Sequence, residues 1–182
     1  MKFISILALI FLISNISFSQ KMITRNGEIK FEASMVALEE VAAINKTVSC
    51  IFDEANGDFV ALALVKAFKF KAPLMEEHFN ENYIESSKFP KATFKGKVLN
   101  FDISKISASK SSYDLEGDLT LHGISKKIKT KISLAVNAGK VSTIANFSIK
   151  PTDYGIEIPS IVKDKIAENV KLSINFILEE KK

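Results

Sequence analysis

The side chains that could act as acids, bases, nucleophiles or metal ligands are few and widely separated in this chain. The two histidines, His78 and His122, have no His-x-x-x-His spacing, no cysteine pair and no acidic cluster beside them. Zinc and similar metals need three or four such ligands brought together, so the sequence predicts no metal site. The single cysteine, Cys50, has no disulfide partner within the chain, and its phase with Val48 and Phe52 predicts a small core residue.

Nucleophile motifs are equally sparse. Ser-x-x-Lys occurs at Ser107–Lys110 and at Ser160–Lys163, but the companion motifs of the penicillin-binding family are missing. The Gly-x-Ser-x-Gly elbow and the phosphate-binding Gly-x-x-x-x-Gly-Lys loop are absent from the sequence as well. We therefore predict that the protein is not an enzyme and carries no cofactor. An enzyme acting on a lipid is kept as an alternative, and it would need two titratable groups converging inside a cavity.

The net charge and the positions of the basic residues limit the classes of partner that the protein can bind. The 182 residues carry a formal net charge of +4, and Arg25 is the only arginine. No basic stretch has aromatic residues spaced to stack on bases, which argues against nucleic acid as a partner. Lys127, Lys129 and Lys131 alternate along one stretch, and we expect them on a solvated outer face. A second interpretation is that they steer the protein toward anionic lipid head groups.

The first residues have the layout of a secretory signal peptide. Lys2 gives a positive start, residues 3–13 are almost all apolar, and a small-residue pattern ends at Ser19. A membrane-spanning helix needs about 20 apolar residues, and this run is shorter. We therefore expect a signal peptide over residues 1–19, cleavage after Ser19, one domain over residues 20–182, and a periplasmic or secreted protein.

Apolar and polar residues alternate along several stretches, which places the apolar groups on one face of a strand. The clearest stretch has five apolar residues in one phase: Val170, Leu172, Ile174, Phe176 and Leu178. Similar alternation runs through residues 28–33, 113–122, 127–136 and 140–149, and Gly-containing turns separate these stretches. The pattern predicts about eight antiparallel strands. Closing them into a barrel removes exposed edges, and a barrel of this size holds either one small ligand or a packed core.

Several segments break the alternation. Pro73 to Glu81 predicts a short helix, because proline suits a first helical turn. A second insertion runs from about residue 151 to 168, with a short helical stretch over Val162 to Ala167. The apolar phase switches after Val98, which predicts a bulge or bend. Residues 59–70 are apolar on both faces and are expected to be covered on both sides, and residues 34–45 fit either a helix or irregular chain.

Three segments carry a resemblance to a known family: HFNENYIESSKFPKATFKG at residues 78–96, GDLTLHGISK at 117–126 and DYGIEIP at 153–159. In this order and spacing they resemble the YceI-like family of exported lipid- or polyisoprenoid-binding proteins. The resemblance extends roughly from Met22 to Glu179. It implies an all-β, extended lipocalin-like antiparallel eight-stranded barrel with short helical insertions. It also implies an isoprenoid chain inside the barrel, a periplasmic location and no established catalytic activity.

The chain departs from the family pattern in one region. The part before Phe68 is compact, with an unusual Ala/Glu-rich stretch at Leu38 to Ala43. This departure leaves open where the mouth of the barrel lies.

An isoprenoid tail has no hydrogen-bonding groups, so it fits a channel lined by side chains that have none either. The free energy of binding then comes from the apolar surface area that is removed from water. The candidate ligand-binding residues are Phe68, Phe70, Met75, Phe79, Phe94, Val98, Leu119, Leu121, Leu134, Phe147, Ile149, Ile174 and Phe176. For a phosphate head group, His78, His122, Lys126 and Arg25 are candidate contacts at the mouth.

We therefore predict that the protein binds or carries a polyisoprenoid or quinone-like lipid, without catalysis. The alternative is a structural or interaction module of the cell envelope with a filled barrel, for which a membrane redox protein would be a partner. An internal cavity would favour the first function, and a solid core the second.

Overall fold

The computed structural model describes residues 21–35 and 40–181, so the predicted signal peptide lies outside the described residues. The barrel wall is built of eight strands. They are β1 (Lys21–Ser34), β2 (Ala42–Asp53), β3 (Asp58–Leu64), β5 (Lys91–Val98), β6 (Ser111–Leu121), β7 (Ile124–Asn137), β8 (Lys140–Ile149) and β9 (Ile166–Glu180). A two-residue strand, β4 (Lys69–Phe70), extends the sheet beside β2.

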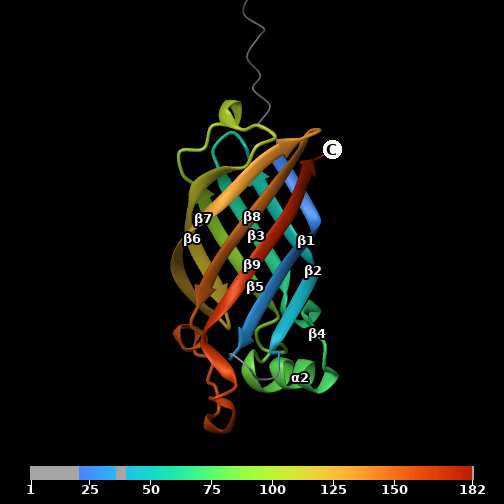
Figure 1. Cartoon of the computed structure of the whole chain (residues 1–182), viewed down its shortest axis with the longest axis vertical. Helices are drawn as coiled ribbons and strands as arrows, with labels where there is room; N and C mark the ends of the chain where they lie inside the picture. The colour runs from blue at the N-terminus through green and yellow to red at the C-terminus, as the bar shows by residue number, and fades with distance from the viewer. Residues whose placement is uncertain (1–20, 36–39, 182) are drawn as a thin grey trace, which may run out of the picture.

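The strands form one closed antiparallel sheet in the order β1-β9-β8-β7-β6-β5-β3-β2, and β2 pairs back with β1. Figure 1 shows the strands wrapping obliquely around a common axis. The pairing of β2 with β1 closes the barrel, so neither of these two strands is left as an exposed edge. The predicted all-β eight-stranded antiparallel barrel is confirmed.

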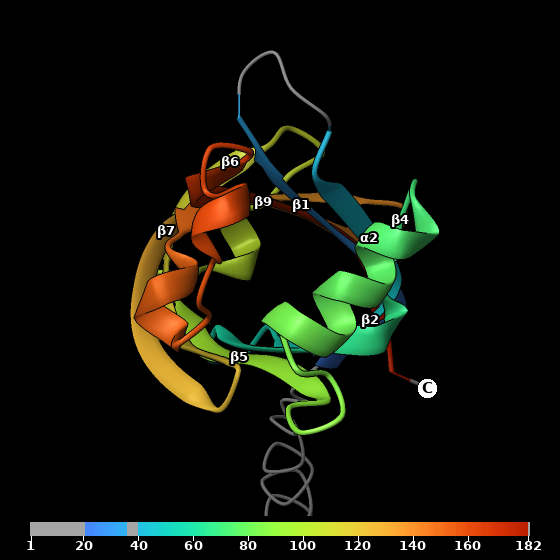
Figure 2. The same ribbon diagram turned by 90° about the horizontal axis from the view of Figure 1, so that it is seen from below.

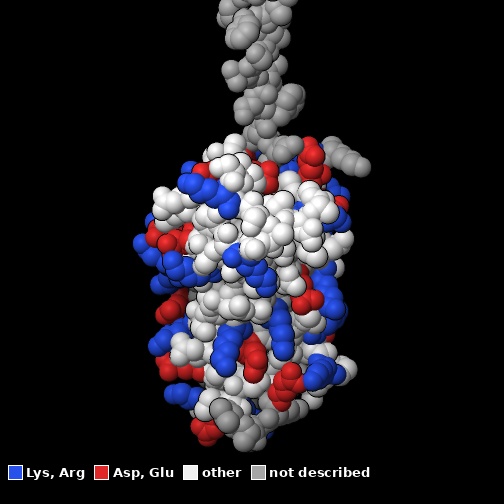
Figure 3. Space-filling view, turned by 45° about the horizontal axis from the view of Figure 1, so that its top comes forward, with Lys and Arg blue, Asp and Glu red and all other residues white. Residues whose placement is uncertain are grey.

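Alternation along the strands sorts side chains between the interior and the solvent. On β9, Phe176 and Leu178 are fully buried, whereas Asn175 and Glu179 are exposed. Oppositely charged side chains pair across the outer surface, as between Lys129 and Glu116 at 2.7 Å. Figure 3 shows such cations and acids interleaved over the wall. The lysine stripe of β7 is therefore a solvated outer face, as predicted.

One end of the barrel carries most of the helical segments. They include α2 (Pro73–His78), a π-helical turn η2 (Phe79–Tyr83), and the 3-10 turns η4 (Pro151–Tyr154) and η5 (Ser160–Val162). Seen from this end, α2 lies on one side of the barrel and the η4–η5 segment on the other (Figure 2). We call this the helical end. The predicted helix at 73–81 is confirmed in its first turns.

The prediction of a short helix over Val162 to Ala167 is wrong. The chain makes only the 3-10 turn η5 there, and β9 already begins at Ile166, which pairs with Ser34 of β1. Strand pairing satisfies the backbone groups of this segment and overrides its helical spacing. For residues 34–45 the structure has β1 ending at Ser34 and β2 beginning at Ala42, while residues 36–39 lie outside the described residues.

The phase switch after Val98 marks the end of a strand, not a bulge within one. Strand β5 stops at Val98, because its neighbour β3 extends no further than Asp58. The chain turns at Asn100 and enters the short 3-10 helix η3 (Ile103–Lys105). Phe101 packs against Phe52, with ring centroids 4.9 Å apart, and covers this end of the barrel. We call it the closed end.

The prediction that residues 59–70 are covered on both faces is also wrong. Phe59, Ala61 and Ala63 point into the barrel and are buried, but Val60 and Leu64 are exposed on the outside. A barrel wall is a single layer of strands, so one face of β3 meets the solvent however apolar its residues are.

Candidate functional site

A cavity of about 580 Å³ occupies the half of the barrel nearest the helical end. Its lining residues come from every strand of the barrel wall except β2, and also from β4, α2, η2 and the segment over residues 151–165. Nearly all lining side chains are apolar; the polar ones are Thr93, His78, Tyr83 and Lys165. Leu74, His78 and Lys165 line the cavity and are also exposed, so the cavity reaches the surface between α2 and the segment after η5.

Small inward residues make this half hollow. Along β3 the inward side chain nearest the closed end is Phe59, and the next two are Ala61 and Ala63. Ala33 of β1 and Ala92 of β5 line the same space. Each alanine leaves open the volume that a larger side chain would fill, and the surrounding wall is held apart by strand pairing, so it does not collapse.

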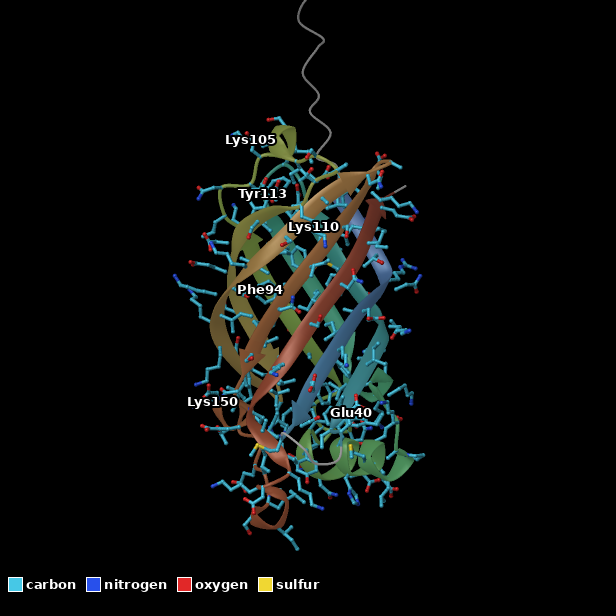
Figure 4. The ribbon with its side chains drawn as sticks, in the orientation of Figure 1. Glu40, Phe94, Lys105, Lys110, Tyr113 and Lys150 are labelled. Carbon is cyan, nitrogen blue, oxygen red and sulfur yellow. The ribbon has the colours of Figure 1, made fainter. Side chains whose placement is uncertain are left out.

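Aromatic rings form the floor between the hollow half and the filled half. Phe59 lies 6.3 Å, centroid to centroid, from both Phe94 and Phe176. The Phe94 ring lies over two glycines of the wall: a Cβ on Gly96 or Gly117 would stand 2.5 or 2.6 Å from its Cζ. Figure 4 shows Phe94 between Tyr113, toward the closed end, and Glu40 and Lys150, toward the helical end. Only glycine at these two positions lets the ring lie flat there.

A second aromatic cluster fixes α2 and η2 to the barrel. Phe31, Phe68, Phe70 and Phe79 contact one another, with centroids 5.1 to 6.3 Å apart. All four line the cavity. The helical turns are therefore part of the cavity wall and are held there by the rings that form it.

His122 ties together three loops at the helical end. Its Nε2 lies 3.0 Å from Glu85 Oε2, and its Nδ1 lies 3.1 Å from the Tyr154 carbonyl oxygen. The Phe89 ring packs against the imidazole at 4.3 Å. Glu85 Oε2 and the Tyr154 carbonyl oxygen are both hydrogen-bond acceptors, so an imidazole N–H suits either position. Hydrogen bonds from Lys88 and from His122 lower the pKa of Glu85.

These contacts join the three sequence segments that carry the family resemblance. Glu85 and Phe89 come from the first, His122 from the second and Tyr154 from the third. Residues next to them, including Ile84, Leu121 and Ile156, line the cavity. The three segments therefore meet beside the cavity. We call the contacts of His122 with Glu85, Phe89 and Tyr154 the latch.

The chain matches the YceI-like domain over residues 14–178. It belongs to the YceI-like family. Solved structures similar to this YceI-like barrel include a polyisoprenoid-binding domain from Saccharophagus degradans, with TM-score 0.76 and 14% identity over 88% of this chain and 98% of that one. Burkholderia cenocepacia BcnA gives TM-score 0.67 and 16% identity over 83% and 95%. The Campylobacter jejuni YceI protein gives 0.61 and 17% over 81% and 89%.

Comparison with curated protein sequences gave no match. The likeness to these three structures confirms the barrel fold.

Ten of the residues predicted to contact a ligand line the cavity of this YceI-like barrel: Phe68, Phe70, Met75, Phe79, Phe94, Leu119, Leu121, Phe147, Ile149 and Ile174. The other three, Val98, Leu134 and Phe176, also point inward, but they lie in the packed core instead of the cavity lining and are at most 1% exposed. Alternation identifies an inward side chain, but it carries no information on whether that side chain faces space or another side chain.

Of the four candidate head-group contacts, only His78 lines the cavity. His122 is held in the latch, and Arg25 and Lys126 are exposed away from the lining. Lys165 and Tyr83 line the cavity too, and no motif in the sequence signals them. Val170 and Leu172 are further lining residues, and the alternation of β9 places them in phase with Ile174.

Other chemistry finds little support in the described residues. No group of three or more His, Cys, Asp or Glu side chains is placed to hold a metal ion in that part of the chain. Cys50 is buried, and burial raises the pKa of its thiol, which disfavours the nucleophilic thiolate. Within residues 21–35 and 40–181, no helix has the length and apolar character to cross a bilayer.

Proposed function

We propose that this protein binds one isoprenoid or quinone-like lipid in its hollow half and carries it outside the cytoplasm without catalysing a reaction. The observation that supports this most is the cavity itself: about 580 Å³, lined almost wholly by apolar side chains and open at the helical end. The name of the Saccharophagus degradans relative, a polyisoprenoid-binding domain, supports the same ligand class. The signal-peptide pattern at residues 1–19 supports export to the periplasm or beyond.

The volume of the cavity limits how much lipid it holds. A water molecule occupies roughly 30 Å³ of the liquid, and we take the same volume for each heavy atom of a ligand. A cavity of 580 Å³ then holds about 20 heavy atoms. That corresponds to about four isoprene units. We infer that a longer chain leaves its remaining units outside the mouth.

The distribution of polar groups sets the orientation of the ligand. Among the described residues that line the cavity, Thr93 is the polar one that lies on a strand, whereas His78, Tyr83 and Lys165 come from the segments around the mouth. A head group buried among apolar side chains would lose its hydrogen bonds to water without replacement. The tail therefore enters first, and the head group stays near Lys165 and His78.

A filled barrel that serves only as an interaction module fits the closed half but not the hollow one. A core built for packing alone would not keep three adjacent small side chains, such as Ala61, Ala63 and Ala92, facing empty space, because each unfilled methyl-sized void lowers stability. The cavity therefore favours the lipid carrier over this alternative.

Uptake of geranylgeraniol, a 20-carbon isoprenoid, by the purified protein tests the proposal. We expect binding by the wild type and loss of at least about tenfold in affinity for Ala63→Trp, because the indole fills space that the tail needs. Ile177→Trp, on the outer wall of β9, is the matched control and should bind as the wild type does. No uptake by the wild type, together with no lipid in protein extracted from its native host, would contradict the proposal.

A further inference from the structure

The most exposed large apolar side chains in the described residues lie at the mouth of the cavity. Ile161, in η5, is 88% exposed, and Leu74, in α2, is 62% exposed. Single exposed apolar residues are common on protein surfaces, but these two lie on the two segments that flank the cavity opening. Figure 2 shows these segments on opposite sides of the helical end, and Figure 1 shows the orange-red η5 segment projecting beyond the strands.

An apolar path leads from these tips into the cavity. Leu74 lines the cavity itself, and Val162, which follows Ile161, lines it too. Met35, which is also exposed, donates its backbone N–H to the Lys165 carbonyl oxygen at 3.3 Å and so lies beside the same segment. A lipid tail at this surface would pass from one apolar environment to another without crossing water.

Charge near the η5 tip suits a surface of anionic head groups. Lys163 and Lys165 follow Ile161 and are exposed, and Asp164 is the acid between them. Long lysine side chains keep their ammonium groups at a polar boundary while an apolar neighbour enters the hydrocarbon. The acids of α2, such as Glu77 on its exposed side, oppose this attraction on the other flank.

We propose that the helical end docks on a lipid bilayer, with Ile161 inserting at the head-group boundary, Lys163 and Lys165 contacting anionic head groups, and the cavity mouth facing the membrane. This proposal rests on the proposed lipid carriage, since it supplies the route by which the cargo enters and leaves. Docking itself needs only the exposed tip and its lysines, so the two can fail separately.

The chain contains no tryptophan, so one introduced residue reports its own surroundings. The Ile161→Trp protein is mixed with vesicles of phosphatidylethanolamine and phosphatidylglycerol, and emission is recorded with and without brominated lipid. The expected result is a shift to shorter wavelength and quenching. The matched control, Ile177→Trp, replaces an isoleucine that is 57% exposed on the wall and should show neither change. Both variants share the same N-terminal residues, so any effect of those residues is common to both.

Sedimentation with vesicles gives the second measurement. Ile161→Ser should lower the vesicle-bound fraction about tenfold, because one buried isoleucine side chain is lost from the membrane contact. Ile177→Ser should leave it unchanged. Vesicles of phosphatidylcholine alone should bind the wild type less than anionic vesicles do, and added salt should remove that difference.

The outcomes separate the two proposals. An unshifted Ile161→Trp, or equal shifts in both variants, overturns the docking proposal, and geranylgeraniol uptake from detergent still tests carriage. A shifted Ile161→Trp, in a protein that takes up no isoprenoid and carries no lipid when extracted from its native host, supports docking and overturns carriage. Ile161→Ser should keep its uptake from detergent, because Ile161 does not line the cavity.

Discussion

The two halves of this barrel share the same strands but differ in what their inward residues fill. Toward the closed end, Phe52, Phe59 and Phe176 meet around the axis, and Phe101 closes over them. Toward the helical end the same strands place alanines inward, and about 580 Å³ stays open. One half therefore supplies stability through packing, and the other gives up some packing to hold a ligand. The difference comes from side-chain volume, because the backbone pairing is continuous along both halves.

The largest effect is expected from opening the filled half. Phe176→Ala removes a fully buried ring that stacks near Phe59, so the free energy of unfolding should fall by about 3–5 kcal/mol. Denaturant titration measures this change. Geranylgeraniol affinity, measured where the variant is still folded, should stay close to that of the wild type. A clear loss of affinity would mean that the two halves are not separate.

The same change in the hollow half should cost less. Phe147 lines the cavity and is only half-buried, so its ring has fewer packing partners to lose. Phe147→Ala should lower the free energy of unfolding by about 1–2 kcal/mol and weaken isoprenoid binding. Equal destabilisation by Phe147→Ala and Phe176→Ala, measured in the same titration, would erase the distinction between the halves.

The smallest effect concerns the latch at the helical end, and it depends on pH. Hydrogen bonds from Lys88 and His122 lower the pKa of Glu85. Its ionised form therefore stabilises the fold above the ordinary glutamate pKa, and that contribution is lost as pH falls through the lowered value. Wild type should exceed Glu85→Gln in stability at neutral pH, and the gap should close in acid. Thermal unfolding across pH measures it.

A gap between wild type and Glu85→Gln that stays constant down to acid pH would assign the effect to packing instead of charge. The rings of Phe52, Phe59 and Phe176 carry no titratable group, so the destabilisation by Phe176→Ala should vary little over the same pH range.

The sequence by itself determined the barrel, its strand number and the inward phase of most strands. Period-two alternation is a local signal, and residues such as Leu119 and Ile149 were placed correctly from it. The segment of helical spacing after Val162 was misplaced, because the pairing of Ile166 with Ser34 depends on a strand far away in the chain. The switch after Val98 signalled a strand end only once the length of β3 was known.

Only the tertiary structure decided which inward residues enclose space. Val98 and Phe94 share one phase of one strand, yet Val98 lies in the packed core and Phe94 faces the cavity. The latch formed by Glu85, His122 and Tyr154 could not be predicted from the sequence either. Its three residues lie far apart in the chain and meet only at the helical end of the folded barrel. Inward direction is set by local backbone geometry, but emptiness is set by the summed volume of side chains that meet across the axis.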